Sequence, residues 1–517
     1  MLIALLLIPL LAAVAVMLTP RAHRDLPRMI AVLAGAMTAG VGVLAFVQFN
    51  PADGMNYLVK IPWVASLGLY LHLGADGLNI GLLLMGSIVA YAASMASWGI
   101  EKLHKEFYAL LLLMTAGILG AFASQDLFWF YFFHELALVP TFIMIGVWGT
   151  GMDKAYAAFQ ITLYLTAGAL VALAGLILLY VKMPAGARTF DIGAMTAFFQ
   201  ANPLPASDQI LIFGLLLFGF GVLVSLWPFH TWAPLGYASA PASNAMLHAG
   251  VLKKFGLYGL LKVALPMLPL GAQKWLPILA LLCLGNLLYC GWVAMRQRDL
   301  NLLIGNSSVA HMGFCFLGIA SFTVAGLTGA VLVMVAHGFL AALSYALTGW
   351  LRQQAGTLEM DKLGGLLQRM PFVGTCLAMA MLAGCGVPGF ANFAGELMVL
   401  FGAWKSQFAP AWITVCAAWG ALVIGGVYML RAIRSVLHGP LPATASGYAD
   451  VAQAAKLPFV ILLACLLVFG VRPGLLTSLV EPEAARLVQA ASVKTARAPS
   501  LEPASHLMAN SQPVAAP

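Results

Sequence analysis

The sequence predicts an all-α polytopic membrane protein. Of its 517 residues, 62% are hydrophobic and only 9% are charged, and the mean hydropathy is +0.94. A membrane-spanning helix needs about 20 mostly apolar residues, and runs of this kind cover most of the chain. These runs lack the alternating strands of about ten residues that form a transmembrane barrel. Because a backbone in lipid must satisfy its own hydrogen bonds, the spans are expected to be helical.

About fourteen apolar runs are long enough to be transmembrane helices. They centre near residues 1–19, 29–48, 77–98, 107–123, 127–148, 156–182, 209–227, 241–263, 272–293, 303–322, 324–350, 373–402, 410–432 and 457–472. The first run has no basic segment at its start and no clean A-x-A cleavage site after it. We therefore expect it to be a retained span and not a signal peptide.

The basic residues of the loops predict an orientation with the N-terminus outside. One set of alternate loops then lies in the cytoplasm and holds Arg21, Arg24, Arg28, Lys102, Lys105, Lys154, Arg296, Arg298, Arg352, Lys362, Arg369, Arg431, Arg434 and Lys456. The opposite loops hold about half as many, namely Lys60, Lys182, Arg188, Lys262, Lys274, Lys405 and Arg472. This bias follows the positive-inside rule. The net charge of +8 is thus a topology signal, which favours lipid as a partner and does not indicate nucleic acid.

Charged residues interrupt three of the apolar runs. Glu135 lies within residues 127–148, Lys253 and Lys254 lie within 245–261, and Glu396 lies within 387–404. A charge at the centre of a bilayer costs roughly 2.5–3.5 kcal/mol on insertion scales, so such residues indicate an ion or proton path. Histidines accompany them at His134, His230, His248, His311 and His337. A proton path needs groups that can titrate near neutral pH, which suits this mixture.

Two of the expected spans contain helix-breaking residues. The seventh run meets Trp227–His230, which includes Pro228, and the twelfth contains Gly384–Phe390 at mid-membrane depth. Irregular backbone at that depth is tolerated where it is buried in protein or lines a wet cavity. Paired broken helices are typical of inverted repeats in transporters.

The breaks predict a division of the chain into five parts. Residues 1–106 would hold the first three helices, 107–263 the first five-helix repeat, 264–435 the second, and 436–489 the last helix and its flank. Residues 490–517 are rich in Ala, Pro and Ser, and we expect them to be a disordered tail.

No motif in the chain indicates a cofactor or metal. The sequence contains no Walker loop, no G-x-G-x-x-G and no ligation pattern for haem or iron–sulfur clusters. The seven cysteines fall in or beside apolar spans without a C-x-x-C pair, and they are interpreted as small core residues. If the chain belongs to a redox enzyme, the electrons are expected to travel elsewhere.

Several stretches resemble the antiporter-like subunits of respiratory complex I, and most nearly the subunit M, or chain 4, branch of that family. The principal stretches are Asp126–Pro140, Pro228–Pro234, His248–Lys254 and Ser307–Gly313. Further support comes from Leu73–Gly77, Gly146–Gly149, Val387–Gly389 and Ala394–Gly402, in the family's order and spacing. Together they cover about residues 65 to 435.

The resemblance implies a fourteen-helix proton-translocating subunit with two inverted five-helix repeats and a line of charged residues along the membrane midplane. By family position, Glu135 matches the coupling glutamate of the fifth helix, Lys254 the central lysine of the eighth, and Glu396 the glutamate near the break of the twelfth. His230, His311 and His337 match histidines near the water-filled channels. Lys253, His134 and His248 are further candidates for the relay.

Partners and cofactors also follow from the resemblance. It implies other membrane subunits of a complex I-like assembly as partners, especially neighbouring antiporter-like subunits. NADH, FMN, iron–sulfur clusters and quinone are expected in those partners. The expected location is a bacterial inner membrane.

The chain departs from the family at two positions, which makes it a divergent member. In gapless register from Pro228–His230, the seventh-helix lysine that pairs with the fifth-helix glutamate falls on Leu223. After Asp299, where the family usually has a Lys-Arg pair, this chain has Asn301 and Leu302. Glu135 is therefore without its usual cation.

Three function hypotheses follow from these observations. The chain could be a proton-pumping, non-redox subunit of a complex I-type NADH:quinone oxidoreductase. It could instead belong to a multi-subunit cation/proton antiporter or a membrane-bound hydrogenase, with Na⁺ in place of H⁺. The third hypothesis is a scaffold subunit that has lost pumping, for which Leu223 is the main support.

Overall fold

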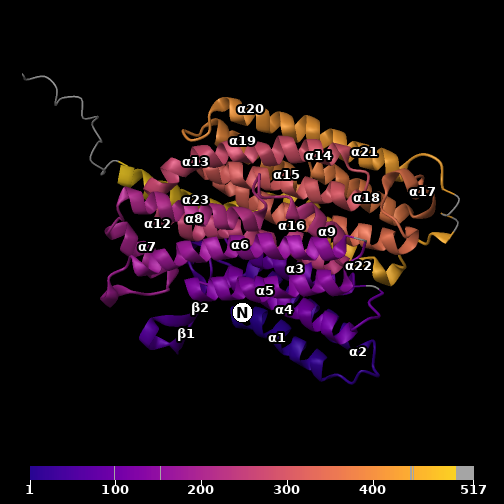
Figure 1. Cartoon of the computed structure of the whole chain (residues 1–517), viewed down its shortest axis with the longest axis horizontal. Helices are drawn as coiled ribbons and strands as arrows, with labels where there is room; N and C mark the ends of the chain where they lie inside the picture. The colour runs from indigo at the N-terminus through magenta and orange to yellow at the C-terminus, as the bar shows by residue number, and fades with distance from the viewer. Residues whose placement is uncertain (98, 152, 443–444, 446, 496–517) are drawn as a thin grey trace, which may run out of the picture.

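The computed structural model describes residues 1–517 except 98, 152, 443–444, 446 and 496–517. It is mostly helical, and the long helices lie side by side with their axes along the longest dimension of the molecule (Figure 1). Within the described residues, nine helices are long and apolar enough to cross a membrane, or up to ten if the bent pair α22 and α23 counts as one span. The structure therefore confirms a membrane protein built from helices.

The elements before the first break follow the expected runs closely. They are α1 (Leu2–Leu18), α2 (Leu26–Val47), β1 (Asn56–Val64), β2 (Leu69–Ala75), α3 (Ile80–Met95), α4 (His104–Ala123), α5 (Leu127–Trp148), α6 (Lys154–Val181), α7 (Ile192–Ala201) and α8 (Ala206–Val224). The start of α5 is fixed by Asp126, whose carboxylate accepts hydrogen bonds from the backbone N–H groups of Phe128 and Trp129. This is a helix N-cap, which replaces the missing intrahelical acceptors at the first turn.

The remaining helices are more often interrupted. They are α9 (Trp232–Ser239), α10 (Ala242–Gly250), α11 (Phe255–Gly259), α12 (Leu265–Met267), α13 (Pro269–Leu284), α14 (Gly291–Arg296), α15 (Leu300–Ser321), α16 (Val324–Ala355), α17 (Leu366–Arg369), α18 (Pro371–Gly384), α19 (Ala391–Trp404), α20 (Ala411–Trp419), α21 (Gly426–Leu437), α22 (Leu457–Val471) and α23 (Gly474–Thr495). Both expected breaks are present, between α8 and α9 and between α18 and α19. Some expected spans consist of shorter helical pieces. The number of single helices long enough to cross a membrane is therefore lower than the expected fourteen spans.

The eighth expected span is a third interrupted helix, in addition to the two breaks predicted from the sequence. Residues 241–263 were expected to form one continuous helix. Instead α10 ends at Gly250, a 3₁₀ turn covers Leu252–Lys254, and α11 follows. The interruption places both lysines in irregular backbone at the centre of the bundle.

A two-stranded antiparallel sheet is the clearest departure from the all-α expectation. Strand β1 pairs with β2, with Lys60 opposite His72. Five of the nine residues of β1 are exposed, and polar and apolar residues are mixed along it, so this segment lacks the apolar run of a span. Lys60 Nζ and His72 Nδ1 each lie 2.9 Å from Asp191 Oδ2, which anchors the hairpin to the N-cap of α7.

The chain after residue 472 also differs from expectation. Helix α23 continues to Thr495, where a flank and then a disordered tail from residue 490 were expected. Its first half packs against α16 and α3, with Leu476 and Val480 fully buried. Burial of these apolar side chains stabilises a helix whose composition alone does not predict one. Residues 496–517 of the expected tail lie outside the described residues.

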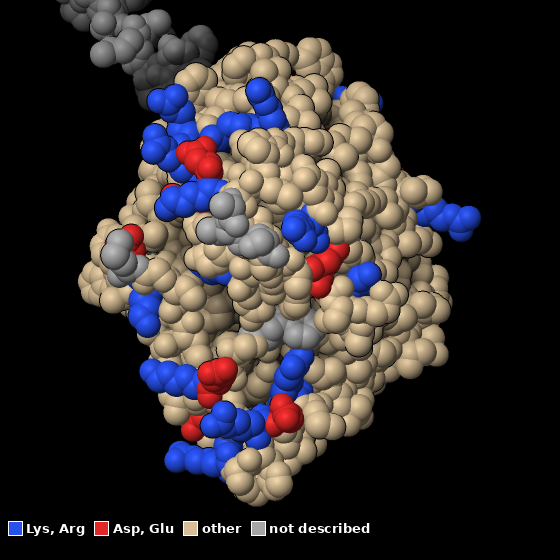
Figure 2. Space-filling view, turned by 90° about the vertical axis from the view of Figure 1, so that its right-hand side faces the viewer, with Lys and Arg blue, Asp and Glu red and all other residues tan. Residues whose placement is uncertain are grey.

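The loops with most of the basic residues share one end of the bundle, which we call the basic end. Arg21 pairs with Glu106, the indole of Trp148 donates to the Lys102 carbonyl, Arg352 bonds to Thr150, and Arg431 bonds to the Gln297 carbonyl. Figure 2 shows this end, where Lys and Arg side chains gather. The β1–β2 hairpin lies at the opposite end, which we call the hairpin end (Figure 1).

Helix α16 forms the centre of the fold. In its most apolar segment every residue is buried in the protein, whereas only 39% of the residues are buried in the corresponding segments of α2 and α6. Helices α10, α15, α18, α19, α22 and α23 all contact it. Its side chains therefore face protein on every side, and polar groups placed on α16 must find partners within the protein.

Candidate functional site

A hydrogen-bonded pair of basic residues lies at the centre of the bundle. Lys254 Nζ is 2.8 Å from His337 Nδ1 and donates a second hydrogen bond, 2.7 Å long, to the carbonyl O of Ala249. Both side chains are buried, and neither contacts a carboxylate directly among the residues that the structure describes. A buried amine beside an imidazole has nitrogen lone pairs between which a proton can move.

Close approach of two helices makes this contact possible. A Cβ on Gly250 would lie 3.0 Å from the carbonyl O of Gly338, so larger residues at these positions would push α10 and α16 apart. Small residues at helix interfaces in membranes allow such approach. His337 precedes Gly338 on α16, and the 3₁₀ turn after Gly250 carries Lys254 toward it.

The pair continues through His311 to Glu396. The rings of His311 and His337 have centroids 5.4 Å apart, and His311 Nε2 lies 3.7 Å from Glu396 Oε1. His311 Nδ1 is 2.8 Å from the carbonyl O of Ser307. Because a carbonyl only accepts, Nδ1 carries the hydrogen in this contact, and Nε2 remains to exchange a proton with Glu396.

We call Lys254, His337, His311 and Glu396 the central row. Its members come from the 3₁₀ turn Leu252–Lys254 and from helices α16, α15 and α19, so the row connects four separate elements of the bundle. Alternating basic and acidic groups let the charge at one site change the protonation of the next. The structure thus brings together four of the six principal residues expected from the sequence.

The break between α18 and α19 shapes the Glu396 end of the row. Gly386 has a φ of +67°, and a Cβ there would lie 2.7 Å from Glu396 Oε2. Glycine is therefore required at this position both for the backbone conformation and for the approach of the carboxylate. A narrow hollow of about 10 Å³, lined by Glu396, His311 and Tyr428 among others, has room for about one water molecule.

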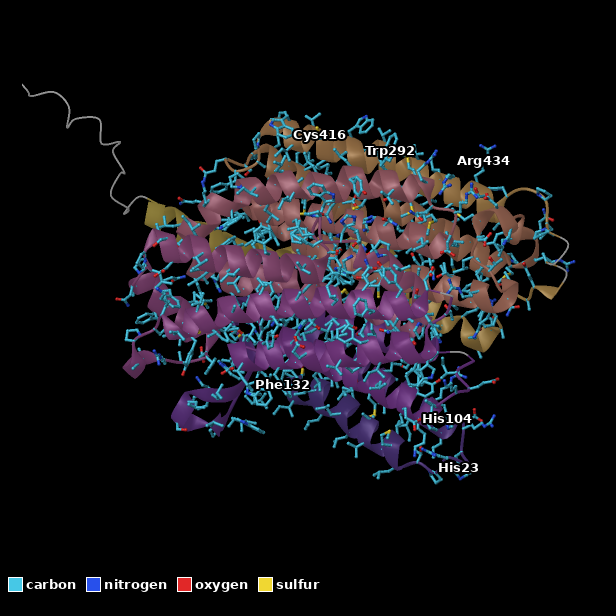
Figure 3. The ribbon with its side chains drawn as sticks, viewed as in Figure 1. His23, His104, Phe132, Trp292, Cys416 and Arg434 are labelled. Atoms are coloured by element: carbon cyan, nitrogen blue, oxygen red, sulfur yellow. The ribbon has the colours of Figure 1, made fainter. Side chains whose placement is uncertain are left out.

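Glu135 lies apart from the central row. It shares the outward face of α5 with Phe128, Phe132 and Val139, and 35% of its side chain is exposed. Figure 3 labels Phe132 at this outer face. The carboxylate contacts His134 Nδ1 at 3.3 Å and lines a largely apolar hollow of about 440 Å³ between α5 and α6.

His134 does not extend this contact to the central row. Its ring stacks on Phe255 at 4.0 Å, which places an apolar side chain beside it. Leu223, where the resemblance to the family predicts a lysine, is 3% exposed and belongs to the apolar core of α8. Within the described part of the chain, no ion pair of Glu135 with Lys or Arg is present.

The other expected residues occupy separate positions. Lys253 bonds to Ser308, which precedes His311 by about one turn on α15, and lies over the Tyr237 ring. His248 packs between the rings of Trp232 and Tyr237. His230 sits in the α8–α9 break with its edge to Tyr289, and within the described residues no hydrogen bond or ring contact joins it to the central row.

Sequence reasoning missed the residue that seals the α8–α9 break. Asn286 accepts a hydrogen bond from the backbone N–H of Trp227 and donates to the carbonyl groups of Ser225 and Val309. An asparagine in an apolar run was the available signal, because a buried amide needs partners. Asn286 stands in a π-helical segment, Gly285–Cys290, where α13 widens.

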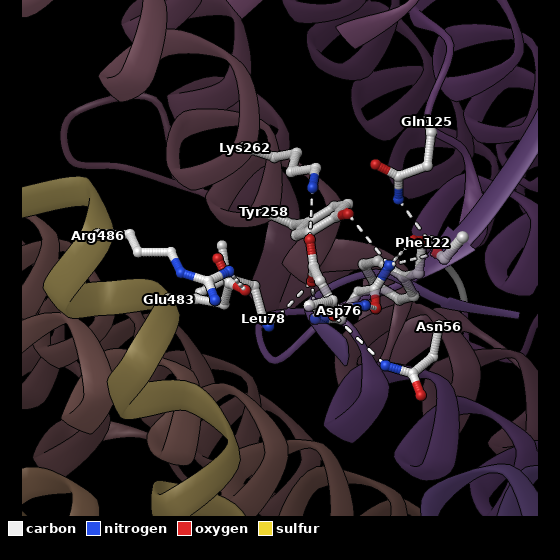
Figure 4. A network of polar contacts seen from close by, with 12 residues as sticks. Asn56, Asp76, Leu78, Phe122, Gln125, Tyr258, Lys262, Glu483 and Arg486 are labelled. Atoms are coloured by element: carbon white, nitrogen blue, oxygen red, sulfur yellow. Dashed lines mark hydrogen bonds and ion pairs between the residues drawn. The ribbon is translucent and has the colours of Figure 1, made fainter. Parts of the chain in front are cut away.

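A second missed group is a polar network at the hairpin end. Lys262 pairs with Asp76, and Asn79 donates hydrogen bonds to Tyr258, to the Phe122 carbonyl and to the Gly74 carbonyl (Figure 4). Glu483 of α23 lies beside it, paired with Arg486 (Figure 4). Asp76 was visible in the sequence within Leu73–Gly77, but its partner Lys262 was assigned to a loop.

The described residues contain no group of three or more His, Cys, Asp or Glu side chains placed to hold a metal ion. The seven cysteines are free, and four of them are buried. The chemistry that the arrangement supports is the transfer of protons between titratable side chains in the interior of the bundle.

Comparison with known proteins places these features in a family. The family model described as NADH:quinone oxidoreductase/Mrp antiporter, TM, matches residues 124–421. The chain is similar to NADH-quinone oxidoreductase subunit M of Rhodobacter capsulatus, with 32% identity over 481 residues, 91% of this chain and 92% of that protein.

Two solved structures are similar in fold. A chain of respiratory complex I from Thermus thermophilus with bound NADH has a TM-score of 0.86 and 26% identity, covering 95% of this chain and 100% of that one. A chain of the Mrp complex from Dietzia sp. has a TM-score of 0.81 and 19% identity, covering 95% and 98%. The second likeness concerns the fold alone.

Proposed function

This chain belongs to the NADH:quinone oxidoreductase/Mrp antiporter family, and we propose that it is the proton-translocating membrane subunit of a complex I-type NADH:quinone oxidoreductase. The central row is the observation that carries the proposal. Four titratable side chains from four elements meet in the interior, although each one is costly to bury. A row with no transport role has no evident reason to persist there.

In this function the central row moves protons and does no redox chemistry. Lys254 gives a proton to His337, His311 exchanges protons with Glu396, and water links the two imidazoles. NADH, FMN, iron–sulfur clusters and quinone belong to partner subunits, as does the free energy of quinone reduction. The chain is then an enzyme subunit without a redox site of its own, surrounded by other membrane subunits and lipid.

The finer architecture is part of the same proposal. We infer fourteen spans with two inverted five-helix repeats, at residues 107–263 and 264–435. The breaks between α8 and α9 and between α18 and α19 support this, because each falls in the fourth span of its repeat. The gathering of Lys and Arg at the basic end supports an N-terminus outside a bacterial inner membrane (Figure 2).

One observation favours a second candidate, a scaffold subunit that has lost pumping. Leu223 leaves Glu135 without the cation that the family provides, so the first half of the relay is incomplete. The central row argues against complete loss, because its four members remain in contact.

The test is proton pumping by the whole parent complex in proteoliposomes, comparing the native chain with Lys254→Met. Methionine keeps the length and apolar stem of lysine and removes the amine. We expect the number of protons moved per electron to fall by this subunit's share, with quinone reduction slowed in coupled vesicles. An unchanged ratio in an assembled Lys254→Met complex would identify the chain as a scaffold. A ratio that depends on Na⁺ would favour the cation/proton antiporter alternative.

A further inference from the structure

Lys253 is a buried amine for which the central row has no role. Its side chain is 1% exposed, and family position assigns the central lysine to Lys254. Lys253 Nζ donates a hydrogen bond of 3.1 Å to Ser308 Oγ and lies 5.4 Å from the centre of the Tyr237 ring. Within the described residues, no carboxylate pairs with it. A buried charge of this kind is costly unless it serves a function.

The partners of Lys253 and Lys254 differ completely. Lys254 faces His337 on α16, whereas Lys253 faces Ser308 on α15 and Tyr237 on α9. The 3₁₀ turn therefore gives two successive amines different hydrogen-bonding partners on two different helices. A tandem of this kind could receive a proton on one side and release it on the other.

A row of polar groups leads from Tyr237 toward the basic end. The rings of Tyr237 and Tyr345 have centroids 6.0 Å apart, and His248 lies 5.3 Å from Tyr237. The hydroxyl groups of both tyrosines and Nδ1 of His248 are buried, and none has a hydrogen-bonding partner in the part of the chain that the structure describes. Buried polar groups without a protein partner are ordinarily bonded to water.

The row ends at a hollow that opens at the basic end. This hollow has a volume of about 470 Å³ and is lined by Trp148, Ser243, Asn301, Tyr345, Thr348 and Arg352, among others. Asn301 Oδ1 is also buried without a partner among the described residues. Tyr345 thus lines the hollow and also contacts Tyr237, which lies beside Lys253.

We propose that Lys253 is the residue that loads the relay with protons from the basic end, through the hollow and past Tyr345 and Tyr237. This inference rests on the proposed function. Water in the hollow gives a proton to the Lys253 amine, which forms an ammonium group. After Lys254 has given its own proton to His337, the Lys253 ammonium passes one to the Lys254 amine through water. In the first transfer an O–H bond of a protonated water breaks as the Lys253 N–H bond forms, and in each later transfer one N–H bond breaks as another forms. One proton therefore moves inward.

The like charges of two neighbouring ammonium groups give the step its direction. Two positive charges in one buried site repel each other much more strongly than in water. A proton arriving on Lys253 therefore favours release of the proton from Lys254 toward His337. A single lysine would lack this coupling between loading and release.

The experiment compares Lys253→Met and Lys253→Arg with Lys254→Met in the whole complex in proteoliposomes. Methionine keeps the packing of the lysine stem, and arginine keeps the positive charge over Tyr237 but holds its proton at any working pH. We expect both Lys253 variants to assemble, and both to reduce the protons moved per electron as far as Lys254→Met does. If Lys253 served packing alone, Lys253→Met would keep the native number of protons per electron. If it served only as a fixed positive charge, Lys253→Arg would keep that number.

The outcomes separate this inference from the proposed function. Loss in Lys254→Met together with a native ratio in either Lys253 variant would overturn the loading role alone. A native ratio in Lys254→Met would overturn the proposed function and the inference with it. If Lys253→Met does not assemble, Lys253→Arg decides, because it retains the buried cation.

Phenylalanine substitutions test the path itself. We expect Tyr345→Phe and Tyr237→Phe to slow proton uptake severalfold, since each removes a hydroxyl group that orders water along the row. Tyr156→Phe is the matched control, because Tyr156 is 59% exposed on α6, away from the hollow. Equal rates in Tyr345→Phe, Tyr237→Phe and the control would contradict this route.

Discussion

The two membrane carboxylates of this chain stand in opposite surroundings. Glu396 has a side chain that is 10% exposed, faces His311 and is enclosed by the α18–α19 break. Glu135 has a side chain that is 35% exposed, faces an apolar hollow and contacts His134 and Tyr131 of its own helix. The same residue type thus belongs to a complete row in one place and stands at an outer surface in the other.

The contrast teaches that a carboxylate in an apolar run does not by itself define a relay. What makes Glu396 part of one is the set of partners from α15 and α16, which a sequence pattern does not display. For Glu135, the apolar Leu223 and the Phe255 ring that stacks on His134 leave the carboxylate with no continuation toward the central row among the described residues. A cation from a neighbouring subunit would suit the exposed face of α5.

The largest expected effect comes from neutralising the two carboxylates separately. Because Glu396 lies in the central row, Glu396→Gln should slow proton transfer through this chain by about 100-fold, the order of a general acid–base group. Glu135→Gln should have a clearly smaller effect. The measurement for both variants is proton pumping by the reconstituted complex, as protons moved per electron. Equal losses would contradict the contrast, because Glu135 and Glu396 would then contribute equally to proton transfer.

A restored lysine sharpens this same comparison. In a Leu223→Lys background, Glu135→Gln should reduce proton pumping more than it does in the native chain. The reason is that Glu135 would then have a lysine as the partner that the family resemblance predicts. Leu223→Met is the control, since it changes the side chain at that position without adding charge.

A smaller effect is expected from glycines of the α18–α19 break. Gly386→Ala should lower stability by about 1–2 kcal/mol through its left-handed backbone, and should also slow proton transfer about tenfold by displacing Glu396. Gly389→Ala is the matched control, because its φ is +104° and nothing lies within 4 Å of a Cβ there. Thermal unfolding and pumping together check the pair. Equal pumping in the two variants would mean that Gly386 acts through stability alone.

The smallest effect concerns acid stability at the hairpin end. Burial opposes ionisation of Asp191, but the His72 side chain, the backbone N–H of Ala194 and the Lys60 ammonium hold the pKa of this carboxyl below its ordinary value. Because this pKa is lower in the folded state, ionised Asp191 stabilises the fold at pH values above its unfolded-state pKa of about 3.9. This stabilisation is lost as the pH falls from there toward the folded-state pKa.

Hydrogen exchange of the β2 amides tests this expectation. Protection factors should be constant between about pH 8 and pH 5 and should fall below about pH 4. Asp191→Asn should reduce protection at neutral pH by on the order of 1 kcal/mol. Asp208→Asn, which removes a more exposed pair with Lys182, should change little. A hairpin equally protected at pH 3 would contradict the role of Asp191.

The sequence by itself determined the class, most helix positions, both breaks and the family. Apolar runs report membrane helices directly, because lipid requires long apolar segments and internal backbone hydrogen bonds. Proline and glycine clusters marked the breaks at 227–230 and 384–390 for the same local reason. Glu396, His311, His337 and Lys254 were visible because charged and titratable groups are rare in such runs.

The tertiary structure alone decided which of these residues meet. The contacts of Lys254 with His337 and of His311 with Glu396 join segments far apart in the chain. Helix packing at Gly250 and Gly338 permits the first contact, and Gly386 leaves room for the carboxylate of the second. The 3₁₀ turn that separates the directions of Lys253 and Lys254 arises in a run that reads as one helix. Asn286, Lys262 and the β1–β2 hairpin likewise gain their roles from partners that no local pattern specifies.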